Sequence, residues 1–178
     1  KVLFEDDFSR SSWFEESSDY YEFEYVDGRY RIESKTVSSG YWSVRSQSLE
    51  DTILQVDAQR ESGDADGYFG LVCRHLDGDN YYALVIGSDG FYGIALQLDG
   101  EFEFLDEGMD ASGVILKDAA NRLQADCIGD QLVLYANGQK LLEVQDDSLE
   151  EGDAGVIAGT RTGDEFSALF DQFVIYEP

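Results

Sequence analysis

Residues 67–98 read GYFGLVCRHLDGDNYYALVIGSDGFYGIALQL and hold the clearest structural signal of the chain. Three apolar runs, rich in β-branched and aromatic side chains, are separated by two short polar segments at 76–79 and 88–90. Alternating runs with connections of Gly and Asp predict antiparallel strands joined by hairpins. The centre of the chain is therefore expected to be a three-strand antiparallel sheet.

The two connections also predict which residues face each other across these strands. The loop at 76–79 predicts the pairs Gly70–Val85, Val72–Ala83 and Arg74–Tyr81. The turn at 88–90 predicts the pairs Tyr82–Leu96, Leu84–Ile94 and Ile86–Tyr92. The second set places six large apolar side chains on one face of the sheet, which indicates the buried face.

The same alternating pattern extends over almost the whole chain, and helical periodicity is nearly absent. So many short strands, with no linker between them, predict an all-β, antiparallel two-sheet sandwich of the jelly-roll type, formed as a single domain over residues 1–178. The strands are expected near 2–4, 21–26, 29–34, 42–46, 52–60, 67–75, 80–87, 91–98, 101–105, 121–128, 131–137, 140–145, 153–159 and 166–176.

The opposite face of the central strands is the candidate binding surface. Small side chains form its floor, and aromatic, guanidinium and amide groups stand at its ends, as a shallow sugar or peptide groove requires. Alternatively, the small residues mark where a loop covers the sheet or where curvature crowds it. The candidate ligand-binding residues are Arg45, Tyr68, Arg74, Tyr81 and Gln97.

Two further expectations concern the face of the sheet on which particular side chains lie. In the strand at 42–46, Trp42 and Val44 suit the core, so Arg45 is expected on the candidate binding face. A three-residue loop after Leu98 would keep Phe102 and Phe104 in the core as well.

Charge limits the possible partners. The 178 residues include 12 Lys and Arg against 38 Asp and Glu, which gives a net charge of −26. Such a surface repels phosphate, so nucleic acid and anionic lipid are excluded as partners, and repulsion between two copies favours a monomer. No apolar run is long enough to span a membrane.

Cys73 and Cys127 both fall on the apolar phase of their strands, so both point into the core. This permits a disulfide without deciding between a disulfide and two buried thiols. The acidic surface favours an extracellular or cell-surface location. The sequence begins at Lys1, so an export signal or anchor is expected outside it.

The order of several short segments resembles the concanavalin A-like lectin/glucanase jelly roll, in particular its laminin G-like and 3-keto-disaccharide hydrolase-like group. The resemblance covers almost the whole chain and implies the fold more strongly than the function, because this fold hosts lectins, glycosidases, adhesion modules and spacers. The matching segments are 4–9 with Trp13, 28–32, 66–74, 80–84, 121–123, 137–138 with Leu141, and 170–173.

The resemblance also implies a structural Ca²⁺ where the first and last strands meet, held by Asp7, Asp171 and backbone carbonyls. Glucanases of this fold carry paired catalytic carboxylates on alternating strand positions. This chain has no Glu-x-Asp-x-Glu run. Its nearest approximations, Glu22 with Glu24 and Glu101 with Glu103, are expected on solvated faces.

The sequence therefore predicts a non-catalytic extracellular binding module that binds carbohydrate, or another extracellular ligand, on the concave sheet. Its single imidazole, His75, has no accompanying nucleophile motif. Two alternatives remain open, namely a glycoside hydrolase-like enzyme and a structural or adhesion spacer within a larger surface protein.

Overall fold

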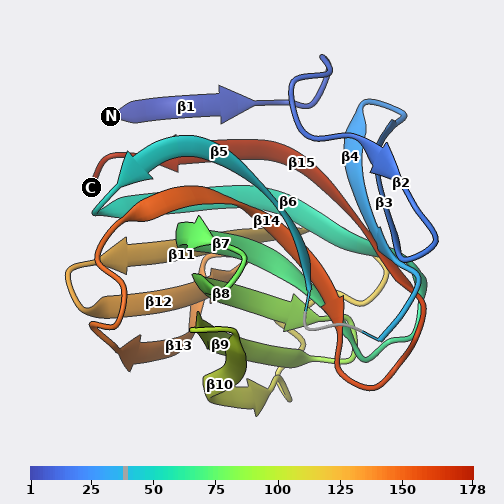
Figure 1. Cartoon of the computed structure of the whole chain (residues 1–178). Coiled ribbons are helices and arrows are strands. Elements are labelled where there is room, and N and C mark those ends of the chain that lie inside the picture. The colour runs from blue at the N-terminus through green and yellow to red at the C-terminus, as the bar shows by residue number, and fades with distance from the viewer. Residues whose placement is uncertain (38–39) are drawn as a thin grey trace.

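The computed structural model describes residues 1–37 and 40–178, and its regular elements are strands. The strands form two antiparallel sheets that pack face to face (Figure 1). The predicted all-β two-sheet sandwich is thus confirmed. Among the described residues, no helix is long and apolar enough to cross a membrane.

The larger sheet has nine strands in the order β13-β12-β11-β6-β15-β4-β3-β2, and β1 pairs with β15. The first and last strands of the chain therefore lie side by side, with Asp6 opposite Phe173. The strands are β1 (Val2–Asp6), β2 (Glu16–Ser17), β3 (Tyr21–Val26), β4 (Arg29–Ser34), β6 (Thr52–Gly63), β11 (Asn121–Ile128), β12 (Gln131–Ala136), β13 (Gln139–Gln145) and β15 (Phe166–Tyr176).

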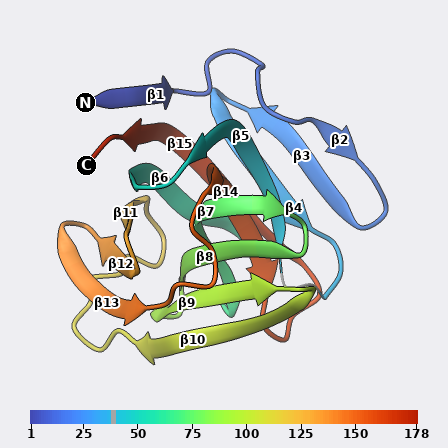
Figure 2. The ribbon, with the colours of Figure 1, turned by 60° about the vertical axis from the view of Figure 1, so that its left-hand side comes forward.

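The smaller sheet has six strands in the order β10-β9-β8-β7-β14-β5 (Figure 2). The late strand β14 lies between the early strands β7 and β5, so β5 joins this sheet only through a strand near the end of the chain. The strands are β5 (Tyr41–Leu49), β7 (Gly67–Asp77), β8 (Asn80–Gly87), β9 (Phe91–Leu98), β10 (Glu101–Met109) and β14 (Gly152–Thr160).

An apolar core fills the space between the sheets, and alternate residues of each strand point into it. Near the start of the chain, Trp13 packs edge-on against Phe173 and next to Phe8, which stacks on Tyr30. A disulfide between Cys73 of β7 and Cys127 of β11 joins the two sheets. Aromatic packing and a covalent link thus both hold the layers together.

The predicted register of the central strands is largely confirmed. Gly70 faces Val85 and Val72 faces Ala83. The pairs of the second hairpin also form as expected, and five of its six apolar side chains are fully buried.

The prediction for Phe102 and Phe104 is wrong. Leu98 pairs directly with Glu101, so the connection is the two-residue turn Asp99-Gly100, with φ of +51° and +83°. Positive φ at both positions is typical of the type I′ turn, whose twist matches that of the flanking strands. One residue fewer in the loop reverses the phase of β10, so both phenyl rings lie on the face away from the core.

Candidate functional site

The face of the six-stranded sheet that points away from the core, called here the outer face, carries a second apolar cluster. Small floor residues and large rings pack against each other there. Its buried members are Tyr68, Val72, Tyr81, Ala83, Val85, Phe91, Ala95 and Ile157, and Trp42, Val44, Phe102 and Phe104 pack against them.

Three of the five candidate residues, Tyr68, Tyr81 and Gln97, lie on the outer face. The tyrosine side chains are only 1% exposed, because neighbouring rings cover them. Small residues make this packing possible. A Cβ on Gly93 would lie 2.7 Å from Cδ1 of Phe104, and a Cβ on Gly159 would lie 2.8 Å from Cζ of Tyr68.

Arg74 does not lie opposite Tyr81, so its predicted place is wrong. The ladder between β7 and β8 is irregular after Cys73, and Arg74 takes a left-handed conformation with φ of +51°. Its guanidinium is 3% exposed and donates hydrogen bonds to the carbonyls of Glu50 and Leu149, each at 3.0 Å. It therefore holds loops together at the end of the sheet.

Arg45 also lies elsewhere than predicted, because the phase of β5 is reversed. Trp42 and Val44 pack on the outer face. The guanidinium of Arg45 lies 5.0 Å from the ring centroid of Phe4 and donates to the carbonyl of Ser12 at 2.6 Å. Arg45 thus anchors the N-terminal segment to the edge of the sheet.

One end of the outer face is hollowed into a depression of about 590 Å³. Its apolar wall is aromatic, since Tyr68 stacks on Phe102 and meets Phe104 edge-on. Glu107 and Arg161 also line it and supply charged groups of both signs. We call this depression the Tyr68 pocket. It is lined by Val37, Tyr68, Phe102, Phe104, Glu107, Thr160 and Arg161.

Arg161 is held firmly at the rim of the Tyr68 pocket. Its Nε donates to the carbonyl of Asp66 at 2.9 Å, and it pairs with the carboxylate of Asp89. Its guanidinium carbon lies 4.2 Å from the ring centroid of Phe91. A guanidinium fixed in this way is ready to bind hydroxyl or carboxylate groups without further ordering.

The other end of the outer face carries a ring cluster formed by Trp42, His75 and Tyr81. The Trp42 ring lies 5.3 Å from that of His75 and 5.4 Å from that of Tyr81. Desolvation lowers the pKa of His75 and raises the pKa of Tyr81 to about 12, so both rings are neutral at pH 7. Within the described residues, Nε2 of His75 and Oε1 of Gln97 are buried without a hydrogen-bond partner.

Neither acidic pair expected on a solvated face reaches the outer face. Glu22 and Glu24 lie on β3 of the other sheet, where they pair with Lys35 and Arg31. In the six-stranded sheet, the central outer-face positions are apolar, small or amide, and none is a carboxylate: Tyr68, Gly70 and Val72 of β7, Tyr81, Ala83 and Val85 of β8, and Phe91, Gly93, Ala95 and Gln97 of β9. A retaining glycosidase needs two carboxylates about 5–5.5 Å apart, and the Tyr68 pocket is lined by one, that of Glu107.

Asp7 and Asp171 lie near the paired strands β1 and β15. Asp7 accepts a hydrogen bond from the backbone N–H of Ser9 at 3.0 Å, and Ser9 lowers the pKa of its carboxyl. Asp171 accepts one from Gln172 at 2.8 Å. Among residues 1–37 and 40–178, no three His, Cys, Asp or Glu side chains group as a metal site. Calcium would therefore need backbone carbonyls and water for most of its six to eight ligands.

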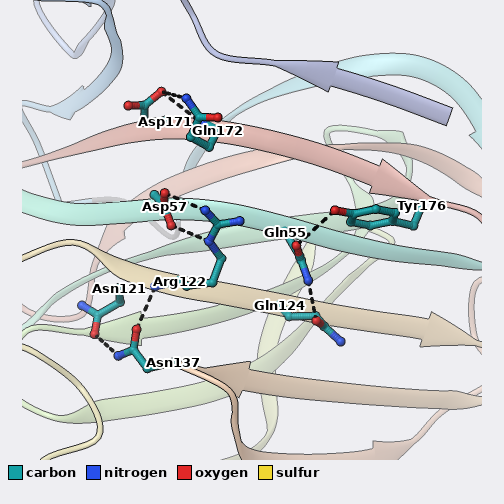
Figure 3. A network of polar contacts seen from close by, with 9 residues as sticks. All are labelled: Gln55, Asp57, Asn121, Arg122, Gln124, Asn137, Asp171, Gln172 and Tyr176. Atoms are coloured by element: carbon teal, nitrogen blue, oxygen red, sulfur yellow. Dashed lines mark hydrogen bonds and ion pairs between the residues drawn. The ribbon is translucent and has the colours of Figure 1, made fainter. Parts of the chain in front are cut away.

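The nine-stranded sheet also has a face that points away from the core. On that face, polar side chains are hydrogen-bonded or ion-paired to each other (Figure 3). Arg122 makes a bidentate ion pair with Asp57, at 2.6 and 2.8 Å. Gln55 bridges Gln124 and Tyr176 in the same layer. These groups satisfy each other, so this face offers few free groups to a ligand.

Sequence reasoning missed Trp42, Phe102, Phe104, Glu107 and Arg161 as outer-face residues. The turn sequence Asp99-Gly100 was the available signal for the two phenyl rings, since it favours a two-residue type I′ hairpin. Arg161 lies in a loop after β14, and no local pattern predicted its return to the sheet.

This geometry can be compared with known proteins. No family model matches the chain, and no curated protein matches it in sequence. Solved structures do match over nearly its whole length. The carbohydrate-binding module CBM66 from Bacillus subtilis has a TM-score of 0.69 at 16% identity, covering 95% of this chain and 93% of that one. A Bacillus licheniformis β-glucanase has a TM-score of 0.70 at 10% identity, covering 98% of each chain.

The fold is the concanavalin A-like jelly roll. At these identities the likeness shows the fold alone. A concanavalin A-like region also occurs within the GH43 protein BlXynB from Bacillus licheniformis, where the match has a TM-score of 0.71 and 14% identity and covers 96% of this chain but 38% of that protein. The jelly roll thus occurs in a carbohydrate-binding module and in proteins named as glycoside hydrolases.

Proposed function

We propose that this jelly roll is a non-catalytic carbohydrate-binding domain whose ligand occupies the Tyr68 pocket. The observation that supports it best is the pairing of an aromatic wall with fixed charged groups. Sugar rings place their apolar C–H faces on aromatic side chains, and their hydroxyl groups bond to carboxylate and guanidinium groups. In the Tyr68 pocket, Phe102 and Phe104 supply the aromatic surface. Glu107 and Arg161 supply the charged hydrogen-bonding groups.

The similarity to CBM66 supports the same assignment, and so does the single carboxylate at the pocket. We further propose that the domain works outside the cell as a monomer. The disulfide between Cys73 and Cys127 supports an oxidising compartment. The net charge of −26 supports separate copies, because like charges repel.

The test is binding to a panel of soluble polysaccharides and their oligosaccharides, by affinity electrophoresis and then by titration calorimetry. Phe102→Ala and Glu107→Gln should each weaken binding at least about tenfold, since one removes a stacking surface and the other a charged hydrogen-bond acceptor. Tyr20→Ala is the matched control, because Tyr20 is 62% exposed and does not line the pocket.

Three results would overturn the proposal. Binding that survives both pocket variants would place the site elsewhere. Release of reducing ends from any bound glycan, abolished by Glu107→Gln, would make the domain an enzyme. If no glycan binds at all, the jelly roll serves as a structural spacer.

A further inference from the structure

A second depression lies between the edges of the two sheets and shares no lining residue with the Tyr68 pocket. It has a volume of about 510 Å³ and runs from β3 of the larger sheet to β5, the terminal strand of the smaller one. We call it the edge groove. It is lined by Phe14, Tyr21, Phe23, Gly40, Tyr41, Trp42, Ser43 and Val44.

Aromatic rings form a continuous wall in the edge groove. Phe14 meets Phe23 edge-on with ring centroids 5.0 Å apart, and Phe23 meets Tyr21 at 5.3 Å. Tyr21 in turn lies 5.0 Å from Tyr41. Phe14 remains 50% exposed although it borders this wall. Phe14 thus extends the apolar lining of the groove to the surface, and contiguous apolar surface of this kind is typical of ligand-binding grooves.

Carboxylates adjoin this wall. Glu15 and Glu16 follow Phe14 directly, and the Tyr21 hydroxyl donates a hydrogen bond to Glu16. The Tyr30 hydroxyl donates to the carbonyl of Phe14 at 2.6 Å. Burial raises the pKa of Tyr30, and the negative charge of Glu15 adds a smaller contribution in the same direction. The carboxylate of Glu16 thus lies beside the aromatic wall, at Tyr21.

The cationic side chains nearest the groove are occupied elsewhere. Lys35 pairs with Glu22 at 3.2 Å, and Glu22 alternates with Tyr21 and Phe23 and so points to the other face of β3. Arg45 lies over Phe4 and bonds to Ser12. Neither is among the residues that line the edge groove.

We propose that the edge groove binds an organic cation with an apolar shell, of the quaternary ammonium class. Such a cation is drawn to the negative faces of aromatic rings, and its methyl groups fill apolar space that a hydrated metal ion cannot fill. The carboxylates of Glu15 and Glu16 and the net charge of −26 complement its charge. This site is separate from the proposed carbohydrate site, so either proposal can fail without the other.

The experiment titrates the protein with choline, with tetramethylammonium and with 3,3-dimethylbutan-1-ol, the neutral carbon analogue of choline. Trp42 lines the groove and is one of only two tryptophans, so its fluorescence reports occupancy. Both cations should give a saturable change, and the alcohol should bind at least about tenfold more weakly because it lacks the charge. Titration calorimetry repeats the measurement without the fluorophore.

Two variants locate the cation. Phe14→Ala removes one exposed ring and should weaken choline binding about threefold, and Glu16→Gln should weaken it while keeping the shape of the side chain. Tyr20→Ala and Phe102→Ala should leave it unchanged, because neither residue lines the groove. Equal binding of the alcohol and choline would overturn the proposal, as would no saturable response to either cation. Loss of choline binding in Phe102→Ala would also overturn it.

Discussion

The imidazole of His75 stacks on the ring of Tyr81, with centroids 5.6 Å apart and planes inclined by 23°. Strict alternation along β7 would give that place to Arg74. The positive φ of Arg74 interrupts the alternation, so its side chain turns to the end of the sheet and the next residue takes its place on the outer face. One backbone angle thus exchanges a cation for a neutral ring beside Tyr81.

Arg74→Ala should destabilise the protein strongly. It would leave the buried carbonyl of Leu149 and the partly buried carbonyl of Glu50 without this donor, and an unpaired buried acceptor costs about 1–3 kcal/mol. The midpoint of urea unfolding should therefore fall well below that of the exposed control variant Arg10→Ala. A midpoint equal to the control would show that these contacts contribute nothing.

Stability should depend on His75 as the pH falls. Burial lowers its pKa below the ordinary value of about 6.5, partly offset by Asp153 and Asp77, so near pH 6 the unfolded chain binds more protons than the folded one. The contribution of neutral His75 to the free energy of unfolding is complete above about pH 6.5. It is lost as the pH falls through the pKa of His75 in the folded protein. Urea unfolding of wild type and His75→Gln should converge on acidification. If the unfolding free energies of the two proteins changed in parallel with pH, this prediction would be wrong.

The disulfide should stabilise the sandwich by about 4 kcal/mol, because it closes a loop between residues 54 apart in the chain. The double variant Cys73→Ala, Cys127→Ala should therefore unfold at much lower urea concentration than wild type. Wild type measured in reducing buffer should shift in the same direction. A loss below about 1 kcal/mol would mean that core packing alone joins the sheets.

Calcium should raise the melting temperature if Asp7 and Asp171 hold it as the fold resemblance implies. The shift should disappear with EDTA and in Asp171→Asn. Asp19→Asn is the control, because Asp19 is an exposed carboxylate away from these strands. An equal shift in both variants would indicate general screening of the acidic surface instead of a bound ion.

The sequence supported the architecture well because alternation and turn residues act locally. The apolar phase of β8 and β9 is unambiguous, so their register was predictable. The sequence prediction failed in β5, where the more apolar phase, Trp42 and Val44, packs on the outer face. Tyr41 packs against the core instead, because pairing with the distant β14 decides which face is buried. A positive φ at a non-glycine residue such as Arg74 likewise leaves no local signal.

The length of the turn Asp99-Gly100 decides which side chains of β10 face outward. The strand after it alternates Glu101, Phe102, Glu103 and Phe104, with the phenyl rings facing outward. If the loop took up Glu101 as a third residue, Phe102 would pair with Leu98, both rings would turn toward the core face, and the two glutamates, two residues apart, would face outward. On this scaffold, an outward aromatic surface and an outward pair of carboxylates therefore differ by one residue in the length of a single loop.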